Sequence, residues 1–227
     1  MTELTIRPVR GLPELREGDD LAQMIRERAE LEDGDVVVVA QKAISKIEGR
    51  VVRADEDEKV EVILREAKRV VRRRGSLVIA ETAHGFICAS AGVDASNAPE
   101  PDTLVLLPVN PDASAARLRD ELGKLTGCEV GVVVTDSFGR PWRQGTTDVA
   151  IGAAGIEVLR DLKGERDPNG YELKSTVIAI ADEIAGAAQL VMGKLDRTPV
   201  AIARGLDVHG EGTARDIVMP AERSLFQ

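Results

Sequence analysis

The sequence predicts an α+β fold, in which mixed sheets and several helices share a buried core. β-branched runs and amphipathic segments mix along all 227 residues, without the strict strand–helix alternation of a doubly wound sheet. Hydrophobic residues make up 43% of the chain and aromatic residues only 2%, so Val, Ile, Leu and Ala must form the core. We expect residues 1–227 to form a single unit, either one large domain or two interlocked subdomains without a visible boundary.

The first elements are predicted to be two strands with a helix between them. Residues 4–9 predict a short strand. Residues 17–35 predict a helix for which Asp19 or Asp20 provides the N-cap. The run VVVVA at 36–40 predicts a strand that is buried on both faces.

The middle of the chain predicts a second helix followed by short strands. After the polar stretch 41–50, an amphipathic pattern predicts a helix over residues 57–74. Its last residues, Arg72 to Arg74, belong to the only dense cationic cluster, which favours a solvated helix end over a contact with a substrate phosphate. Apolar runs then predict strands over residues 78–83, 85–92 and 103–108.

The remaining elements are predicted to alternate between helices and strands. Residues 112–127 have capping residues at the front and glycines at the back, which is typical of a helix. Val130 to Thr135 predict a buried strand that leads into Asp136 and a short polar loop. The last predicted elements are a strand in the first part of 148–159, a strand over 176–181, a helix over 181–193 and a strand over 199–206.

Charge and cysteine content argue against several classes of function. The formal net charge is −9 and the pI about 4.9, which disfavours broad binding of nucleic acid. The two cysteines, Cys88 and Cys128, indicate neither a disulfide framework nor a zinc site. There is no signal-peptide pattern and no apolar run of membrane-spanning length, so we expect a cytoplasmic protein.

Two aspartates that follow predicted strands are candidate metal ligands. Asp136 comes directly after a buried strand, and Asp94 follows the strand at 85–92. Each aspartate is also typical of a residue that only caps a turn. If the two meet, their oxygen atoms favour Mg²⁺ or Mn²⁺ over zinc, because the two histidines have no partner at a ligand spacing.

The sequence has no standard phosphate-binding motif. The stretch GRPWRQGTT lacks the spacing and the lysine of a Walker loop, and G-x-G-x-x-G is absent. Lys42 and Lys46 follow a predicted strand and are candidates for phosphate contacts, although each alone is typical of a solvated loop. The sequence does not decide whether Arg140 and Arg143 contact phosphates or substrate carboxylates. Since no Ser-His-Asp or Cys-His set can be assembled, we expect no catalytic residue in the strict sense, but an enzyme that positions and polarises its substrates.

Six segments, spread in order over the chain, together resemble the coenzyme F420-0:γ-glutamyl ligase family. They are GLPELREGDDL (11–21), DGDVVVVAQKAISKIEGR (33–50), GVDASN (92–97), GVVVTDSFGRPWRQGTTDVAIG (131–152), ADEIAGAAQLVMGK (181–194) and PVAIARGL (199–206). The form SFGRPWR is most similar to the ligase half of the bacterial bifunctional enzyme. No segment here resembles the flavin-reductase-like second half of that enzyme.

The resemblance implies an intertwined α+β homodimer and a GTP-dependent ligation. In the implied reaction, the terminal carboxylate of coenzyme F420-0 takes the γ-phosphoryl group of GTP. The amine of L-glutamate then attacks the acyl phosphate and releases phosphate, and further glutamates are added through γ-linkages. Two alternatives stay open: a module that binds F420 or a nucleotide without catalysis, and a metal-dependent phosphohydrolase.

The same resemblance implies site residues, motif by motif. Asp94 and Asp136 would hold Mg²⁺ or Mn²⁺, with Ser137 near a second ion and K⁺ as a further candidate ion. Archaeal relatives have an acid at the position of Lys194, so either the second metal site is lost or Lys194 contacts phosphate directly. The implied GTP contacts are Leu12, Pro13, Glu14, Leu15, Gln41, Lys42, Lys46, Asn97, Met192, Gly193 and Lys194.

Overall fold

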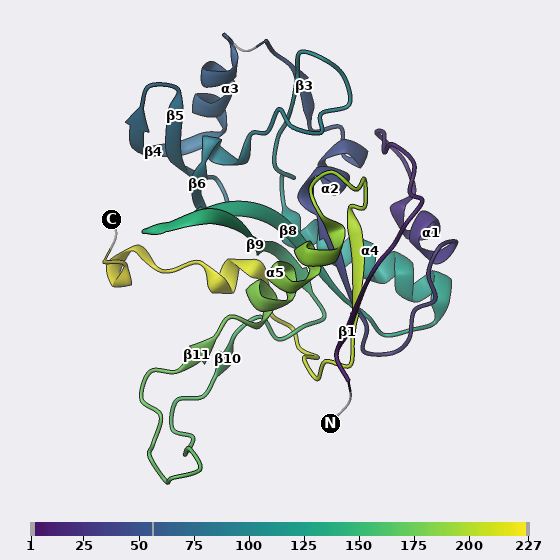
Figure 1. The fold of residues 1–227 in the computed structure, drawn as a ribbon, viewed down its shortest axis with the longest axis vertical. Coiled ribbons are helices and arrows are strands. Elements are labelled where there is room, and N and C mark those ends of the chain that lie inside the picture. Colours follow the sequence, from purple (N-terminus) through teal and green to yellow (C-terminus); the bar gives the residue numbers. More distant parts are fainter. Residues whose placement is uncertain (1–2, 56, 226–227) are drawn as a thin grey trace.

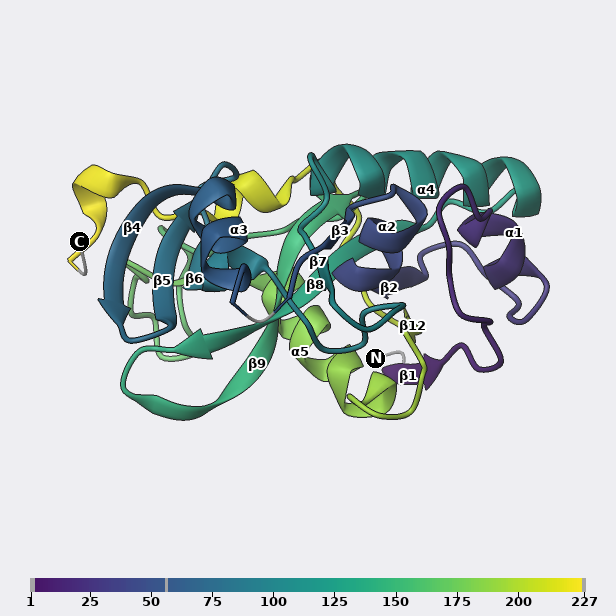
Figure 2. The same cartoon turned by 90° about the horizontal axis from the view of Figure 1, so that it is seen from above.

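A five-stranded mixed sheet with helices on both faces forms the centre of the molecule (Figures 1 and 2). The structure is a computed structural model, which describes residues 3–55 and 57–225. β2 and β8 are parallel, and the other neighbouring pairs of the sheet are antiparallel. The strand order is β1 (Thr5–Pro8), β12 (Val200–Arg204), β2 (Val36–Ala40), β8 (Gly131–Arg140) and β9 (Arg143–Ala154). The mixed architecture with several helices is therefore confirmed.

The valines of β2 and β8 alternate between two cores. Val37 and Val132 lie on one face, which α1 and α4 cover, whereas Val38 and Val133 lie on the other face, against α5. Successive side chains of a strand point to opposite faces, and both faces are buried here, so the run VVVVA is apolar throughout. The three helices are α1 (Leu21–Arg26), α4 (Pro111–Thr126) and α5 (Ile180–Met192).

A smaller layer of short elements adjoins the end of β8 (Figure 2, left). β4, β5 and β6 form one antiparallel sheet, β3 pairs with β7, and their shared core contains Ile63, Val78 and Leu106. The turn η1 leads to Asp94, which forms a bridge with Val105. The elements are β3 (Val51–Arg53), α3 (Lys59–Glu66), β4 (Ala67–Arg74), β5 (Leu77–Thr82), β6 (Ile87–Ala89), η1 (Ser90–Gly92) and β7 (Thr103–Val105). The preceding helix, α2 (Gln41–Ile47), packs into the core of the central sheet.

A two-stranded arm projects from the opposite side of the molecule (Figure 1, bottom). It consists of β10 (Arg160–Asp161), β11 (Val177–Ile178) and the loop between them. The short turns η2 (Ala214–Ile217) and η3 (Ala221–Arg223) follow β12. In the described part of the chain, no helix has the length and apolar character needed to cross a bilayer.

The predicted helix over residues 57–74 is wrong in its second half. α3 ends at Glu66, and residues 67–74 form β4, an edge strand that pairs with β5. Val70 fits the helical spacing but is 42% exposed, and two register shifts in β4 let this spacing fit a strand. Arg72 to Arg74 therefore lie on an exposed strand and not at a helix end.

Other predicted boundaries also change. The helix expected over 17–35 covers only Leu21–Arg26. Its N-cap is Asp20, which accepts the N–H of Gln23 at 2.9 Å. The polar stretch after β2 begins with α2, which buries Ala43 and Ile44. The strand expected over 85–92 is reduced to the three residues of β6 and the turn η1.

Gly152 of β9 lets the first turn of α4 approach the sheet. A Cβ atom at this position would lie 2.4 Å from the Pro111 carbonyl oxygen and 2.5 Å from its carbon. The Asp112 carboxylate accepts the N–H of Ala153 at 2.9 Å, which fixes α4 at this point.

We expect Gly152→Ala to lower the free energy of unfolding by about 1–3 kcal/mol, as measured by urea denaturation. Gly139→Ala in β8 is the matched control, since no atom lies within 4 Å of its Cβ position; equal stability of the two variants would contradict this prediction.

Candidate functional site

The segments of the candidate site meet at one edge of the central sheet. Ala40 and Thr135 pair at the carboxyl ends of the parallel strands β2 and β8. β12 begins at the same edge, where the Ala40 N–H donates to the Pro199 carbonyl at 2.8 Å. Ligands of α/β proteins bind at the carboxyl ends of parallel strands, so this edge is the expected place for a site.

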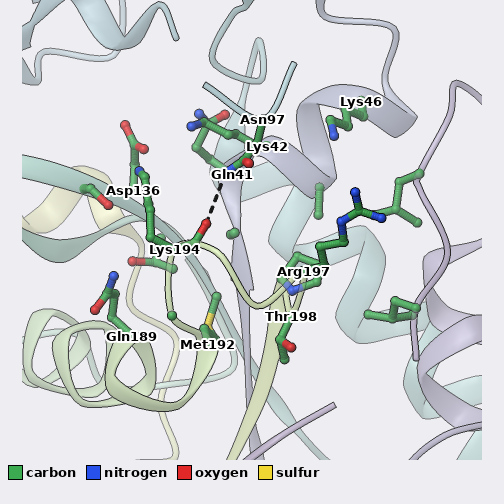
Figure 3. A pocket seen from close by; sticks show the side chains of 18 of the residues that line it. Gln41, Lys42, Lys46, Asn97, Asp136, Gln189, Met192, Lys194, Arg197 and Thr198 are labelled. Carbon is green, nitrogen blue, oxygen red and sulfur yellow. Dashed lines mark hydrogen bonds between the residues drawn. The ribbon is translucent and has the colours of Figure 1, made fainter. Parts of the chain in front are cut away.

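A pocket of about 470 Å³ opens at this edge (Figure 3). All eleven positions at which the resemblance places GTP line the pocket, together with Asp136 and Ser137. Asp94 lies next to the pocket and contacts the lining residue Lys42. Further lining residues, which sequence reasoning missed, include Thr135, Asp148, Gln189, Arg197 and Thr198.

β8 continues through the segment that was expected to be a polar loop, and this continuation gives the site two faces. β8 extends to Arg140 and pairs with β9 up to the exposed turn, where Arg140 and Arg143 face each other. These two arginines are outside the set of described residues that line the pocket. By strand alternation, Asp136 lies on the face of Val132, and Ser137 lies on the opposite face.

The Asp136 face holds two carboxylates and one lysine. The Lys42 ammonium lies 2.8 Å from the Asp94 Oδ2 and 2.8 Å from the Ser96 Oγ. Burial and, to a smaller extent, the negative charge of Asp94 raise the pKa of Asp136 to about 7, against the opposing effects of the Ser137 N–H and the Lys42 ammonium. Burial also raises the pKa of the neighbouring Cys88 thiol to about 12, so this side chain is a neutral thiol at pH 7.

The opposite face holds Asp148, which β9 places beside Ser137. The Asp148 carboxylate accepts hydrogen bonds from the Ser137 Oγ at 2.6 Å and from the Thr135 Oγ1 at 3.3 Å. Burial raises the pKa of Asp148, while these hydrogen bonds and the charges of Lys194 and Lys42 lower it. Asp148 is 7% exposed and lines the pocket.

The other end of the pocket is cationic. Figure 3 shows Lys46 and Arg197 at this end, and Asp136, Gln189 and Lys194 at the other. Lys46 forms an ion pair with Glu14, whereas no ion pair or hydrogen bond of the Arg197 guanidinium occurs within residues 3–55 and 57–225. Arg197 has a left-handed backbone with a φ of +51°, a strained conformation that is typical of functional loops.

Gln41 presents a buried donor without a partner at the start of α2. Its side chain is 1% exposed, and its Oε1 accepts a hydrogen bond from the Ser45 Oγ at 2.9 Å. Its Nε2 has no hydrogen-bond partner in the described part of the chain. A buried polar group of this kind costs stability unless a ligand or water satisfies it, so Gln41 indicates a binding site.

The side chains present have the donor chemistry of a site for a hard divalent cation. Asp94, Asp136 and Ser137 offer carboxylate and hydroxyl oxygens, which Mg²⁺ and Mn²⁺ prefer. Within the described ranges no three His, Cys, Asp or Glu side chains converge on one point. The Lys42 ammonium supplies the positive charge next to Asp94 in this arrangement.

Comparison with known proteins identifies the family. A family model described as F420-0:Gamma-glutamyl ligase matches residues 11–205. The chain belongs to this ligase family. It is 45% identical to the coenzyme F420:L-glutamate ligase of Methanopyrus kandleri over 247 aligned positions, which cover 99% of the chain and 98% of that relative. Two similar relatives with the same name, from Methanocaldococcus jannaschii and Archaeoglobus fulgidus, are 46% and 40% identical over 87% and 97% of the chain and 86% and 95% of their own lengths.

Two signals in the sequence point to the site residues that were missed. Asp148 ends the stretch that begins with the strand before Asp136, and a hairpin between the two aspartates would bring them to one edge. Gln189 lies three residues before Met192, which places both side chains on the same side of α5. Nothing local in the sequence distinguishes Arg197 from a solvated arginine.

Proposed function

We propose that the chain is a GTP-dependent coenzyme F420-0:L-glutamate ligase. The terminal carboxylate of F420-0 attacks the γ-phosphorus of GTP, so that an acyl phosphate forms and GDP leaves. The amine of L-glutamate then attacks the acyl carbon; a C–N bond forms, phosphate leaves and the nitrogen loses a proton. Further glutamates are added in the same way through their γ-carboxylates. The names of the relatives support the substrates, and the pocket supports the use of a nucleotide.

The observation that supports this proposal best is the division of one pocket into a carboxylate end and a cationic end. At one end Asp136 of β8 and Asp148 of β9 lie on opposite faces of the β8–β9 hairpin. Figure 3 shows Lys46 and Arg197 at the other end, where Lys46 pairs with Glu14 of the loop Leu12–Leu15. An elongated polyphosphate that carries a divalent cation matches both ends. Neither face presents an activated nucleophile in the described residues, which suits a reaction between bound substrates.

Each group in the pocket has a proposed role in holding or orienting the substrates. Asp94 and Asp136 would hold Mg²⁺ or Mn²⁺, with Ser137 at a second ion; such a cation neutralises charge on the transferred phosphoryl group. Lys46, the loop Leu12–Leu15, Met192 and Gly193 contact the nucleotide. Asn97 donates to the Lys194 carbonyl at 3.5 Å, so that it ties the 193–199 loop over the pocket.

The test measures product and phosphate with purified protein. With F420-0, L-glutamate, GTP and Mg²⁺, we expect mass spectrometry to show products heavier by one or more glutamate residues, and phosphate release only when all substrates are present. Phosphate release from GTP and metal alone would show a phosphohydrolase, and binding without turnover would show a binding module. ATP in place of GTP and Mn²⁺ in place of Mg²⁺ define the preferences. The proposed homodimer is tested by light scattering on the same sample.

A further inference from the structure

Two residues that line the pocket, Asp148 and Gln189, have no part in the proposed metal and nucleotide contacts. This inference rests on the proposed function, since it assigns the amine substrate of that reaction. We propose that Asp148, Gln189 and Lys194 form the binding site for the incoming amino acid. In it Asp148 binds the ammonium group, Lys194 binds the α-carboxylate, and Gln189 donates to or accepts from the same substrate.

The position of these residues fits the direction from which an amine must attack. Asp136 and Asp148 are neighbours in the same hairpin, but strand alternation places Asp136 on one face of β8 and the Ser137–Asp148 pair on the other. A carboxylate substrate that is activated on the Asp136 face would then have its acyl carbon at the strand end. The amine can approach this carbon from the Asp148 face without passing the nucleotide.

Asp148 retains free acceptor capacity in the pocket. A carboxylate can accept about four hydrogen bonds, and the hydroxyl groups of Ser137 and Thr135 use two of these positions. The hydroxyl donors hold the carboxylate in one orientation, and Asp148 is one of the residues that line the pocket. A buried, oriented carboxylate of this kind is a strong partner for an ammonium group.

α5 places Gln189 over Asp148. In the first turn of the helix, Asp182 accepts the N–H of Ala150 at 2.9 Å, and one turn later the Cβ position of Gly186 lies 3.6 Å from the Asp148 carbonyl oxygen. Gln189 follows three residues after Gly186, so it lies on the same side of α5 and reaches the pocket. Figure 3 shows its amide at the end of the pocket that also contains Lys194 and Asp136.

Charge complementarity selects a zwitterion over a phosphate on this face. Lys194 is held by Gly193, which has a φ of +62°, and by the hydrogen bond from Asn97 to its carbonyl. Lys194 lines the same pocket as Asp148. A phosphate here would meet the Asp148 carboxylate, whereas the ammonium and carboxylate of an amino acid match both charges.

Three ligands test the Asp148–ammonium contact and the Lys194–carboxylate contact independently. L-Glutamate has both groups, glutarate lacks the ammonium group, and 4-aminobutyrate lacks the α-carboxylate. By calorimetric titration, we expect Asp148→Asn to weaken L-glutamate binding about 10- to 100-fold and to leave glutarate binding within about twofold. Lys194→Met should weaken L-glutamate and glutarate and leave 4-aminobutyrate unchanged. Asp161→Asn and Lys163→Met, which break a 2.8 Å pair on the projecting arm, are the matched controls and should bind like the wild type.

The outcomes distinguish this site from the proposed reaction. Equal weakening of all three ligands by Asp148→Asn, or no weakening, would overturn the inference, as would a wild-type protein that does not bind L-glutamate. Lys194 lies on an exposed loop, so Lys194→Met remains informative even if Asp148→Asn disturbs folding. Glutamate binding without ligated product would refute the proposed function alone; product formation with unchanged binding in both variants would refute this inference alone.

Discussion

Asp136→Asn is expected to reduce ligation on the order of 100- to 1000-fold and, at the same time, to stabilise the ligand-free protein. The loss of activity follows if Asp136 holds the divalent cation, because a neutral amide is a poor ligand for a hard ion. The gain in stability follows from burial, since the carboxylate at this position is 9% exposed and its charge is opposed by burial and by Asp94. The amide can still accept the Ser137 N–H.

The stabilisation by Asp136→Asn should depend on pH in a defined direction. Asp136 has a pKa of about 7 in the folded protein and an ordinary pKa of 3.8, so the folded state binds this proton more tightly than the unfolded state. Its contribution to stability is complete below about pH 4 and is lost as the pH rises to 7. Between pH 4 and pH 7, the free energy of unfolding of the variant should therefore rise relative to that of the wild type. Above pH 7 the variant should be more stable by up to about 4 kcal/mol. Urea denaturation from pH 4 to pH 8 measures the difference.

Asp35 provides the contrasting control for Asp136. Its side chain is fully buried, and it accepts two hydrogen bonds of 2.7 Å from the Arg204 guanidinium. Asp35→Asn removes a paired charge and should lower the stability at pH 8, whereas Asp136→Asn should raise it. Added Mg²⁺ should raise the melting temperature of the wild type and of Asp35→Asn only. Normal turnover by Asp136→Asn, or a lower stability of this variant, would contradict the proposed role of Asp136 as a ligand of the divalent cation.

Lys46→Met is expected to weaken GTP binding about 100-fold, because a charge-assisted contact with phosphate contributes roughly 1.5–3 kcal/mol. Lys46 reaches the pocket from the last turn of α2, and in this structure its ammonium pairs with Glu14 of the neighbouring loop. Methionine keeps the apolar stem and removes the charge, so folding should be almost unaffected. Titration with a fluorescent GTP analogue measures the affinity, and thermal unfolding monitors the fold.

Two further variants make the Lys46 result specific. Lys68→Met removes a lysine that is also paired with a glutamate, Glu81, but on the exposed strand β4 outside the pocket; it should leave GTP affinity unchanged. Glu14→Gln releases Lys46 from its partner and should leave the affinity equal or increase it. Unchanged GTP affinity in Lys46→Met would remove this lysine from the proposed nucleotide site.

The sequence predicted most of the central sheet, because its strands are strongly patterned. The continuous β-branched run of β2 and the run before Asp136 have no competing interpretation, and α4 has capping signals at both ends. The small layer was harder, since β4 is a bulged edge strand whose spacing fits a helix as well. Tertiary pairing with β5 decided between the two, and pairing is not a local property.

The pocket was predictable only where residues belong to recognisable motifs. Motif matching placed Lys42, Gly193 and the other implied contacts at positions that the structure brings together in one pocket, although their roles remain predictions. The Lys42–Asp94 pair joins residues far apart in the chain, and no spacing rule reveals it. The two faces of the site around β8 exist because this strand extends to Arg140. The glycine and arginine residues after Phe138 are typical of a loop, so the sequence did not predict this extension.

The position of β12 has a consequence for synthesis of the protein. β12 lies between β1 and β2 in the sheet, although both of these strands are made long before it. During translation the first strand has no neighbour to pair with until Val200–Arg204 leaves the ribosome. The loop 193–199, which supplies several residues of the pocket, emerges directly before β12. A nascent chain that stops before β12 therefore lacks the strand that joins β1 to β2, and such long-range pairing is slow.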